Sequence, residues 1–332
     1  MLGADVLRFA LRRTAQALPL ILGVATLMFL LIHLAPGDAA DAMVGEYPVS
    51  PEYMASVRER YGLDKSLPEQ FIAYLGQLAR GNLGTSFANS SSVLNIILDR
   101  VGNTLILAAT GLIIAAIIGV ALGVWAGVTR KRWLDNLITG SGIGAFSIPA
   151  FWLGQLLLMT FALAWGVLPV SGMTNARASY TGSAYLGDLL LHLILPATAL
   201  ALREIGTTSR IVRTSVKETL GLNHIWTAQA KGLSRWRIIR KHVIRNALLP
   251  GVTVIGYSFG YLLAGSVLVE TVFVWPGMGR LLYESVLRRD NALVIGIVLF
   301  IAATVLVVNL VTDIIYGVID PRIRLTAPKG SR

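Results

Sequence analysis

Long apolar runs without a charged residue constrain the fold of this chain more than any other feature. Five such runs cover residues 14–34, 101–128, 136–176, 246–269 and 291–312. A bilayer is crossed by about 20 residues of helix. Because lipid offers no hydrogen-bond partners, a spanning segment must satisfy its backbone internally and be apolar on all sides. The third run is too long for one span.

A sixth, weaker apolar run lies between Asp188 and Arg203 and is extended upstream by the uncharged residues 178–187. The runs together predict an all-α, polytopic membrane protein with six transmembrane helices. A signal peptide is the alternative for the first run, since Arg8, Arg12 and Arg13 precede it. Its length, and the spans that follow it, favour a retained helix. The chain has no cysteine, which excludes disulfides and thiolate metal sites.

The net charge of +11 is distributed as membrane topology predicts. With six spans and an internal N-terminus, 20 of the 29 Lys and Arg residues fall in internal segments, and nine fall in longer external sequence. Positive residues accumulate in cytoplasmic loops. We therefore expect a multi-pass membrane protein with both termini in the cytoplasm, and no nucleic-acid partner.

The spans divide the chain into four parts. We expect an N-terminal arm and first transmembrane helix at 1–34, an external loop region with short helices at 35–100, a core of five helices at 101–318 and a cytoplasmic tail at 319–332. The core includes a cytoplasmic loop at 217–234. The external region is too small to form a catalytic domain with its own core.

Two short capped helices are predicted in the external region. Ser50 precedes Pro51, and Ser66 precedes Pro68, which places a capping hydroxyl before a proline in the first turn. Gly62 and Gly81 follow the two segments as terminators. Both helices are expected to lie against the external end of the bundle.

Small residues recur at helical spacing within the spans, as in GxxxG contacts between membrane helices. They are Gly119, Gly123, Gly127, Gly256, Gly260 and Ala264. Such residues let two helices approach closely. They indicate either packing within this chain or a contact with another subunit along a translocation path.

Several enzyme motifs fail on their context. The segment 256–260, GYSFG, matches G-x-S-x-G, but it lies within a predicted span and no His–Asp pair is placed to activate Ser258. The four histidines lie in separate segments, so no metal site is predicted. No P-loop motif is present. The chain is therefore predicted to be no enzyme and to bind no ATP through a P-loop of its own.

Acidic residues within spans would indicate coupling to an ion gradient. The candidates Asp188, Glu270 and Asp313 lie near span ends, and no predicted span has an acid in its middle. An ion-coupled secondary transporter is therefore disfavoured but stays as the alternative, because backbone carbonyls can also bind Na⁺.

A basic block at 227–250, TAQAKGLSRWRIIRKHVIRNALLP, is the most informative loop. Asn223 is a plausible N-cap for a helix over residues 224–231, and Gly232 suits the residue after its end. Ser234 is a plausible cap of the next helix, which continues into the fifth span. The basic run after Ser234 is expected to contact lipid headgroups at the inner membrane surface.

Eight segments in order resemble one family over nearly the whole chain. They are LAPGD (34–38), YGLDKSLPEQF (61–71), RGNLGTSF (80–87), SIPAFWLG (147–154), TAQAKGLS (227–234), RNALLP (245–250), VETVFVWPGMGRLL (269–282) and DPRIR (320–324). Together they resemble the B-type permease of dipeptide and oligopeptide ABC importers.

This resemblance implies the transmembrane domain of a type I ABC importer in a bacterial cytoplasmic (inner) membrane, forming half of a pore for peptides. It implies a second, C-type permease, two cytoplasmic P-loop ATPases that bind ATP and Mg²⁺, and an external substrate-binding protein. No cofactor is expected on this chain itself. The family's E-A-A-x-x-x-G coupling loop aligns with residues 226–232, where Trp226 replaces the acid and Gln229 replaces the arginine common in peptide permeases.

The resemblance implies one group of site residues, and a second is predicted because Pro276, Gly277 and Gly279 place irregular backbone near the outer end of the pore. Those expected to contact the ATPase are His224, Ile225, Trp226, Thr227, Ala228, Gln229, Ala230, Lys231 and Gly232. Those expected at an external gate or binding-protein contact are Glu270, Trp275, Pro276, Gly277 and Gly279. The alternative for the second group is a packed turn between two spans.

Overall fold

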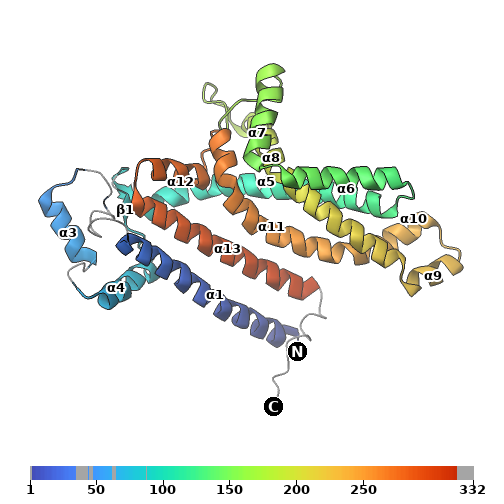
Figure 1. Cartoon of the computed structure of the whole chain (residues 1–332), viewed down its shortest axis with the longest axis horizontal. Coiled ribbons are helices and arrows are strands. Elements are labelled where there is room, and N and C mark those ends of the chain that lie inside the picture. The colour runs from blue at the N-terminus through green and yellow to red at the C-terminus, as the bar shows by residue number, and fades with distance from the viewer. Residues whose placement is uncertain (1, 35–43, 45–47, 62–64, 87, 320–332) are drawn as a thin grey trace, which may run out of the picture. The chain divides into compact units, whose positions relative to one another are not determined.

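The computed structural model describes residues 2–34, 44, 48–61, 65–86 and 88–319, and these are mostly helical (Figure 1). The chain forms two compact units. Unit 1 contains the described residues up to Thr104 together with Pro276–Leu310. Unit 2 contains Leu105–Trp275 together with the described residues after Leu310. Two helices, α5 and α13, contribute to both units.

The described part of unit 1 includes helices from the first third of the chain and the helices that follow residue 276. Its elements are α1 (Leu2–Leu34), α3 (Pro51–Tyr61), α4 (Leu67–Ala79), β1 (Thr85–Ser86), β2 (Ser91–Ser92), the start of α5 (Val93–Val128), α12 (Met278–Leu287) and most of α13 (Asn291–Ile319). The strands β1 and β2 pair antiparallel. A buried apolar cluster joins α5, α12 and α13 through Val93, Ile97, Met278, Leu293 and Ile297.

The predicted caps of the external helices are confirmed. The Ser50 hydroxyl accepts a hydrogen bond from the Tyr53 N–H at 3.2 Å, one turn into α3. The Ser66 N–H and hydroxyl both donate to the Glu69 carboxylate at the start of α4, and this bonding lowers the pKa of that exposed carboxyl. Gly81 has a φ of 73°, as a terminator requires. Gly62 lies outside the described residues.

The helix α4 packs its aromatic face on α1. The Phe29 ring contacts Phe71 and Tyr74, with centroids 5.2 and 5.7 Å away. The His33 Nε2 atom hydrogen-bonds the Gln70 side chain at 2.8 Å. The amphipathic pattern of α4 thus positions it against the first apolar helix within unit 1.

Unit 2 contains the helices that follow the first part of α5. They are α6 (Arg132–Ser147), α7 (Ala150–Leu157), η1 (Leu158–Ala164), α8 (Gly182–Leu220), α9 (Asn223–Ala230), α10 (Arg235–Ile238), η2 (Ile239–Val243) and α11 (Ile244–Val272). The elements η1 and η2 are π-helical turns that continue α7 and precede α11. The long helix α8 packs against both α6 and α11.

Among the described residues, four helices are long and apolar enough to cross a membrane, namely α1, α5, α8 and α13. Two bent pairs bring the number to six if each pair is one span. The long run at 136–176 forms one of these pairs, with α6 and the α7–η1 segment at 102° to each other. Ile148 is extended because Pro149 follows it, and this ends α6. The other bend, of 55°, lies within α11 at Gly265.

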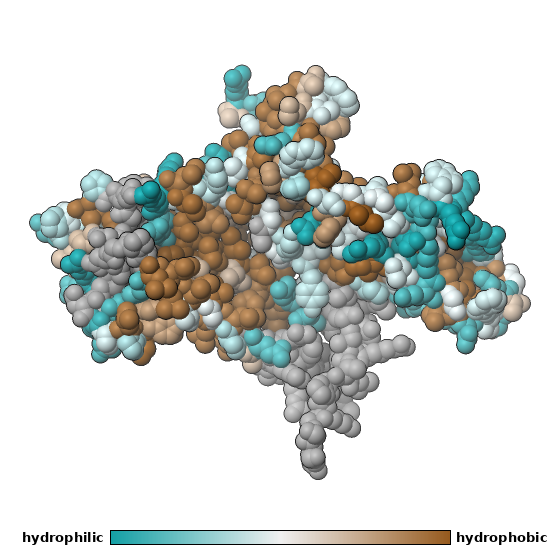
Figure 2. Space-filling view, viewed as in Figure 1, coloured by the Kyte–Doolittle hydropathy of each residue, from teal (hydrophilic) through white to brown (hydrophobic). Residues whose placement is uncertain are grey.

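The surface of these helices suits lipid. Large apolar side chains are exposed along them, for example Ile113 (58%) and Ile117 (66%) on α5. Figure 2 shows hydrophobic residues covering much of the visible surface, while hydrophilic residues gather around α10 and the neighbouring ends of α6 and α8. Exposed apolar surface on this scale marks a membrane-facing protein.

The first small-residue stripe packs two helices of unit 2 together. A Cβ atom at Gly123 would lie 2.6 Å from the Ser209 carbonyl oxygen of α8, and one at Gly127 would lie 2.5 Å from the Val216 side chain. Gly119 meets Thr208 in the same way, at 2.8 Å. Of the two alternatives, the stripe on α5 therefore serves packing within the chain.

Candidate functional site

The helix α9 is a short, separate helix between α8 and α10 (Figure 1). The helix predicted at residues 224–231 is confirmed with a shift of one residue. The prediction of Asn223 as its N-cap is wrong, because Leu222 takes that extended position and Asn223 is the first helical residue. The main chain turns early because α8 ends at Leu220, where Gly221 and Leu222 accommodate the bend.

Gly232 ends α9 as predicted. Its φ is 75°, in the left-handed region that favours glycine. The Gly232 N–H donates to the Gln229 carbonyl at 2.9 Å, and the Leu233 N–H donates to the Ala228 carbonyl at 3.3 Å. These two bonds form a Schellman motif, with Leu233 and Ala228 in apolar contact. The end of α9 is therefore fixed by hydrogen bonds.

One face of α9 is buried in an apolar cluster. Ile225 is fully buried and Ala228 is 5% exposed. They pack in a cluster contributed by α8, the α10–η2 segment and α11, which consists of Val212, Val216, Ile238, Val243 and Ala247. Because this cluster is apolar and closely packed, a displacement of α9 would be transmitted to the ends of these helices.

The opposite face of α9 is exposed. The seven other predicted coupling residues lie there: His224, Trp226, Thr227, Gln229, Ala230, Lys231 and Gly232. Trp226 is 66% exposed, and its ring is the largest side chain on this face. The structure thus places seven of the nine predicted residues on α9 and the other two, Lys231 and Gly232, in the turn that ends it, with Ile225 and Ala228 on the inner face.

The segment after α9 is tied to the end of α5. The Arg235 guanidinium donates to the Val128 carbonyl at 2.7 Å. A cation at a helix C-terminus is favourable because the last carbonyls have no partner within the helix. Part of the basic block therefore caps a neighbouring helix, beyond the predicted role at the lipid surface.

An ion-pair cluster joins α6 to α8 close to this region. The Asp135 carboxylate accepts hydrogen bonds from the Arg213 guanidinium, one of them at 2.7 Å, and from the Lys217 ammonium at 2.6 Å. Asp135 is 9% exposed. Sequence reasoning missed this cluster, although Asp135 is an isolated acid three residues after the end of a run of three basic residues.

The predicted gate residues divide between the two units at the Trp275–Pro276 bond. In unit 2, Glu270 and Trp275 are fully buried. The Trp275 N–H donates to the Glu270 carbonyl at 2.8 Å, and the Phe273 carbonyl accepts from the Gly172 N–H at 2.9 Å. Glu270 and Trp275 therefore belong to a tightly packed turn at the end of α11.

In unit 1, the remaining gate residues are held by α5. The Asn103 side chain donates to the Pro276 carbonyl at 2.8 Å, and the Thr104 hydroxyl accepts from the Met278 N–H at 2.8 Å. Gly277 is the N-cap of α12, and Gly279 lies in its first turn. Sequence reasoning missed Asn103 and Thr104, whose signal was two adjacent polar residues in a charge-free run.

Two charged residues lie in the middle of α8, where the sequence analysis ended the span. The Arg203 guanidinium lies 4.6 Å from the centroid of the Phe146 ring and 4.3 Å from that of Tyr261, and it donates to the Tyr261 hydroxyl. Glu204 is 5% exposed and accepts a hydrogen bond from Ser258. The prediction that no span has an acid in its middle did not consider Glu204, because the predicted span ended at Arg203 while α8 continues to Leu220.

The G-x-S-x-G segment is helical, as expected, since α11 includes residues 256–260. Its Ser258 hydroxyl is 2.5 Å from the Glu204 carboxylate and donates to it, so the serine links α11 to α8. A Cβ atom at Gly256 would lie 2.2 Å from the Thr312 side chain, which shows that this glycine permits a close helix contact.

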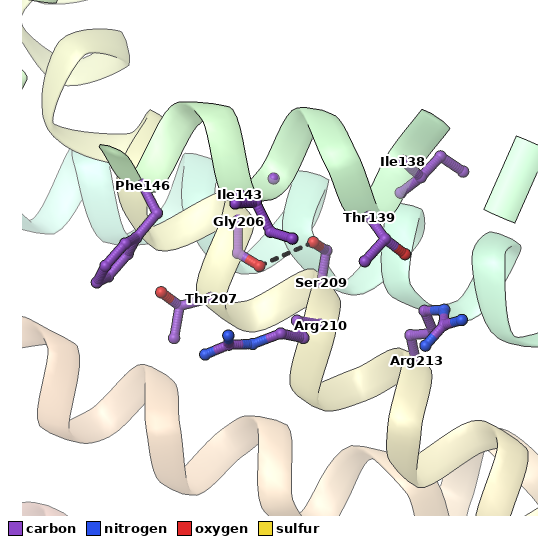
Figure 3. A pocket seen from close by; sticks show the side chains of 10 residues that line it. Ile138, Thr139, Ile143, Phe146, Gly206, Thr207, Ser209, Arg210 and Arg213 are labelled. Carbon is purple, nitrogen blue, oxygen red and sulfur yellow. Dashed lines mark hydrogen bonds between the residues drawn. The ribbon is translucent and has the colours of Figure 1, made fainter. Parts of the chain in front are cut away.

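A small recess lies between α6 and α8 in unit 2 (Figure 3). It has a volume of about 60 Å³. Its lining includes Phe146 and Thr139 of α6, and Thr207, Arg210 and Arg213 of α8. In Figure 3 the Arg213 side chain lies at one end of the recess and the Phe146 ring at the other. The recess is too small for a peptide and fits a single small polar group.

Apolar spanning helices, a short exposed helix between two of them and a packed turn between α11 and α12 define a polytopic transport subunit. The chain matches two family models. They are "Binding-protein-dependent transport system inner membrane component" over residues 119–325, and the N-terminal part of the membrane component of such systems over residues 6–108. The chain therefore belongs to the inner-membrane components of binding-protein-dependent ABC transport systems. Membership implies ATPase and substrate-binding partners.

Curated relatives align over almost their full length. The dipeptide transport system permease protein DppB of Escherichia coli (strain K12) is 38% identical over 336 residues, which cover 96% of this chain and 99% of DppB. The di/tripeptide permease protein DppB of Pseudomonas aeruginosa is 38% identical over 334 residues, with the same coverage. The glutathione transport system permease protein GsiC of Salmonella typhimurium is 38% identical over 319 residues, again covering 96% and 99%.

A solved structure supports the fold. The methionine ABC transporter MetNI, in an inward-facing conformation, contains a chain that matches with a TM-score of 0.55 and 18% identity. The match covers 68% of this chain and 96% of that one. The fold is that of a type I ABC importer membrane subunit, and the chain is a multi-pass permease subunit that leaves ATP hydrolysis to its partners.

Proposed function

We propose that this chain forms half of the translocation pore of a peptide importer. The peptide relatives, aligned over 96% of the chain, support this substrate class. A second, C-type permease would complete the pore, two cytoplasmic ATPases would bind ATP and Mg²⁺, and an external binding protein would deliver the peptide. The distribution of basic residues supports cytoplasmic termini.

The observation that supports the mechanism most is the two-faced structure of α9. Its outer face is exposed and includes Trp226, while Ile225 on its inner face is fully buried in the cluster that joins α8 to α11. We infer that the ATPases contact the outer face and that closure of the ATPases moves α9. The buried contacts would transmit this motion to the spanning helices, giving alternating access.

The segment around Glu270 to Gly279 is proposed as an external gate or binding-protein contact. Val274 supports this, because it is 41% exposed and has a φ of 54°, an uncommon value for a β-branched residue. Such backbone strain often occurs at segments that move or bind. The packing of Glu270 and Trp275 is compatible with the alternative, a packed turn.

The coupling proposal is tested with Gly232→Pro in the complete transporter, reconstituted with its partners. Proline requires a φ near −65° and lacks the N–H that bonds the Gln229 carbonyl, so the end of α9 would be lost. We expect uptake to fall at least tenfold relative to ATP hydrolysis. Unchanged peptide uptake and substrate-stimulated ATPase activity would contradict the proposal.

Two variants serve as controls. Gly232→Asn should retain coupling, because asparagine tolerates a positive φ. Gly166→Pro places the same change at another glycine with a positive φ, 64°, and an open environment, but outside α9. If Gly166→Pro uncouples the transporter as strongly as Gly232→Pro, the effect is not specific to α9.

A further inference from the structure

A polar stripe runs along one side of α8. Arg203, Thr207, Arg210 and Thr214 follow at intervals of four, three and four residues, which places them on a single helix face. None of the four is buried. On the other side of α8, Thr208 and Val212 are buried against the glycines of α5. We call these four residues the polar stripe.

The polar stripe is unsuited to lipid. The helix α8 is long and apolar enough to span a membrane. Charged groups on such helices nearly always face a water-filled cavity or the interior of a bundle. Arg203 lies about 32 Å along the helix axis from Gly182 and about 26 Å before Leu220, so the stripe runs from the middle of α8 toward its C-terminal end.

Aromatic rings lie beside Arg203, at the N-terminal end of the polar stripe. The Arg203 guanidinium lies between the rings of Phe146 and Tyr261, which are 50% and 47% exposed themselves. Tyr257, one turn before Tyr261 on α11, is 46% exposed. This surface is aromatic and cationic, in contrast to the aliphatic surface that α5 exposes at Ile113 and Ile117.

Within the part of the chain that the structure describes, no carboxylate pairs with either arginine of the stripe. Among the described residues, Arg203 forms its hydrogen bond with the Tyr261 hydroxyl, and neither Arg203 nor Arg210 forms an ion pair. Arg213, one turn beyond, differs because Asp135 neutralises it. A guanidinium has five N–H donors, so Arg203 and Arg210 retain donors for a ligand. Their spacing of seven residues corresponds to about 10 Å along the axis.

We propose that the polar stripe lines the translocation path and that Arg203 and Arg210 contact the C-terminal carboxylate of a peptide in transit. This inference rests on the proposed function. Arginine binds carboxylates through two parallel hydrogen bonds. The aromatic rings beside Arg203 offer apolar contact to peptide side chains of many kinds without selecting one. Two cations in series let the carboxylate pass from one to the next toward the cytoplasm.

Cysteine labelling of the reconstituted transporter tests the proposal, because this chain has no cysteine of its own. Thr207→Cys and Thr214→Cys place a thiol on the stripe. Thr208→Cys, at a residue 1% exposed, is the buried control, and Ile117→Cys is the exposed apolar control. Labelling of this chain is followed by mass spectrometry with methanethiosulfonate reagents that have either a sulfonate or a trimethylammonium group.

We expect both stripe cysteines to react and both controls to stay unmodified. The anionic reagent should react several-fold faster than the cationic one at residue 207. Adding Arg203→Gln should abolish this preference, and Arg203→Lys should keep it. A dipeptide with a free carboxylate should slow labelling at residue 207, while its C-terminal amide should not. If Arg203→Gln prevents assembly, Arg210→Gln with labelling at residue 214 gives the same readout.

Three results would overturn the proposal. Unreactive stripe cysteines in an active transporter would mean that the partner permease or lipid covers the stripe. Equal protection by the dipeptide and its amide would exclude the carboxylate contact. Protection by anionic lipid vesicles or inorganic phosphate, but not by the dipeptide, would assign the arginines to phosphate. Labelling does not depend on transport, so it tests the stripe independently of the proposed function. If the parent complex takes up no peptide, the proposed function is refuted whatever the labelling shows.

Discussion

The crossing of α6 and α8 at Gly142 and Gly206 gives the sharpest test of how this chain packs. A Cβ atom at Gly206 would lie 2.4 Å from the Gly142 carbonyl oxygen, 3.1 Å from its carbonyl carbon and 3.2 Å from its Cα atom. All three are backbone atoms, so no side chain can move aside. Ordinary contact begins at 3.4 Å, and the two helices would have to separate by roughly 1 Å.

The cost of Gly206→Ala follows from this geometry. Overpacking of a close contact typically destabilises by about 1–3 kcal/mol. Gly140 and Gly144, also on α6, serve as matched sites, because no other part of the described structure lies within 4 Å of where their Cβ atoms would be. Alanine there should stabilise by about 0.4–1 kcal/mol, because it restricts the unfolded chain. The two kinds of substitution should therefore differ by about 1.5–4 kcal/mol.

The measurement is reversible unfolding of the purified protein in mixed micelles with increasing SDS, followed by circular dichroism. Gly206→Ala should unfold at a lower SDS fraction than the parent, and Gly140→Ala and Gly144→Ala at an equal or higher one. Gly142→Ala should be intermediate, since its Cβ would lie 3.3 Å from the Gly206 Cα atom. If Gly206→Ala and Gly140→Ala unfold at the same SDS fraction, α6 and α8 do not cross this closely at Gly142 and Gly206.

Three further predictions concern single side chains. Asp135→Asn should lower the free energy of unfolding by about 1–3 kcal/mol, because it leaves Arg213 and Lys217 without their carboxylate. In the same unfolding assay Arg213→Gln should destabilise the chain more than Lys217→Gln, because the Arg213 side chain is 23% exposed and the Lys217 side chain is 42% exposed. Asp290→Ala should destabilise the chain by about 1–3 kcal/mol, because the Asp290 carboxylate is buried and accepts hydrogen bonds from the Ser86 hydroxyl and from the Leu293 N–H in the first turn of α13. An Ala variant as stable as the parent would contradict this. Tyr74→Phe should leave the free energy of unfolding equal or higher. The buried Tyr74 hydroxyl has no hydrogen-bond partner among the described residues, and burial raises its pKa to about 12. A clear loss of stability would mean that this hydroxyl does form a hydrogen bond in the protein.

Sequence alone determined the features that depend on the lipid environment or on a local backbone preference. The apolar runs identified the spanning helices, because lipid imposes its requirement on every residue of a segment. Gly232 at the end of α9 was predictable because few other residues adopt a positive φ without strain. The cap at Ser50 followed from its place before Pro51. The family followed from eight motifs in order.

Only the tertiary structure decided which residues face one another. The contact of Glu204 with Ser258 joins residues 54 positions apart, and that of Asp135 with Arg213 joins residues 78 positions apart. No local pattern encodes such pairs, because they depend on the angle and register at which two helices cross. The same holds for the face of α8 that carries Arg203: the residue type was visible in the sequence, but its position between two aromatic rings arises only from the packing of α6, α8 and α11.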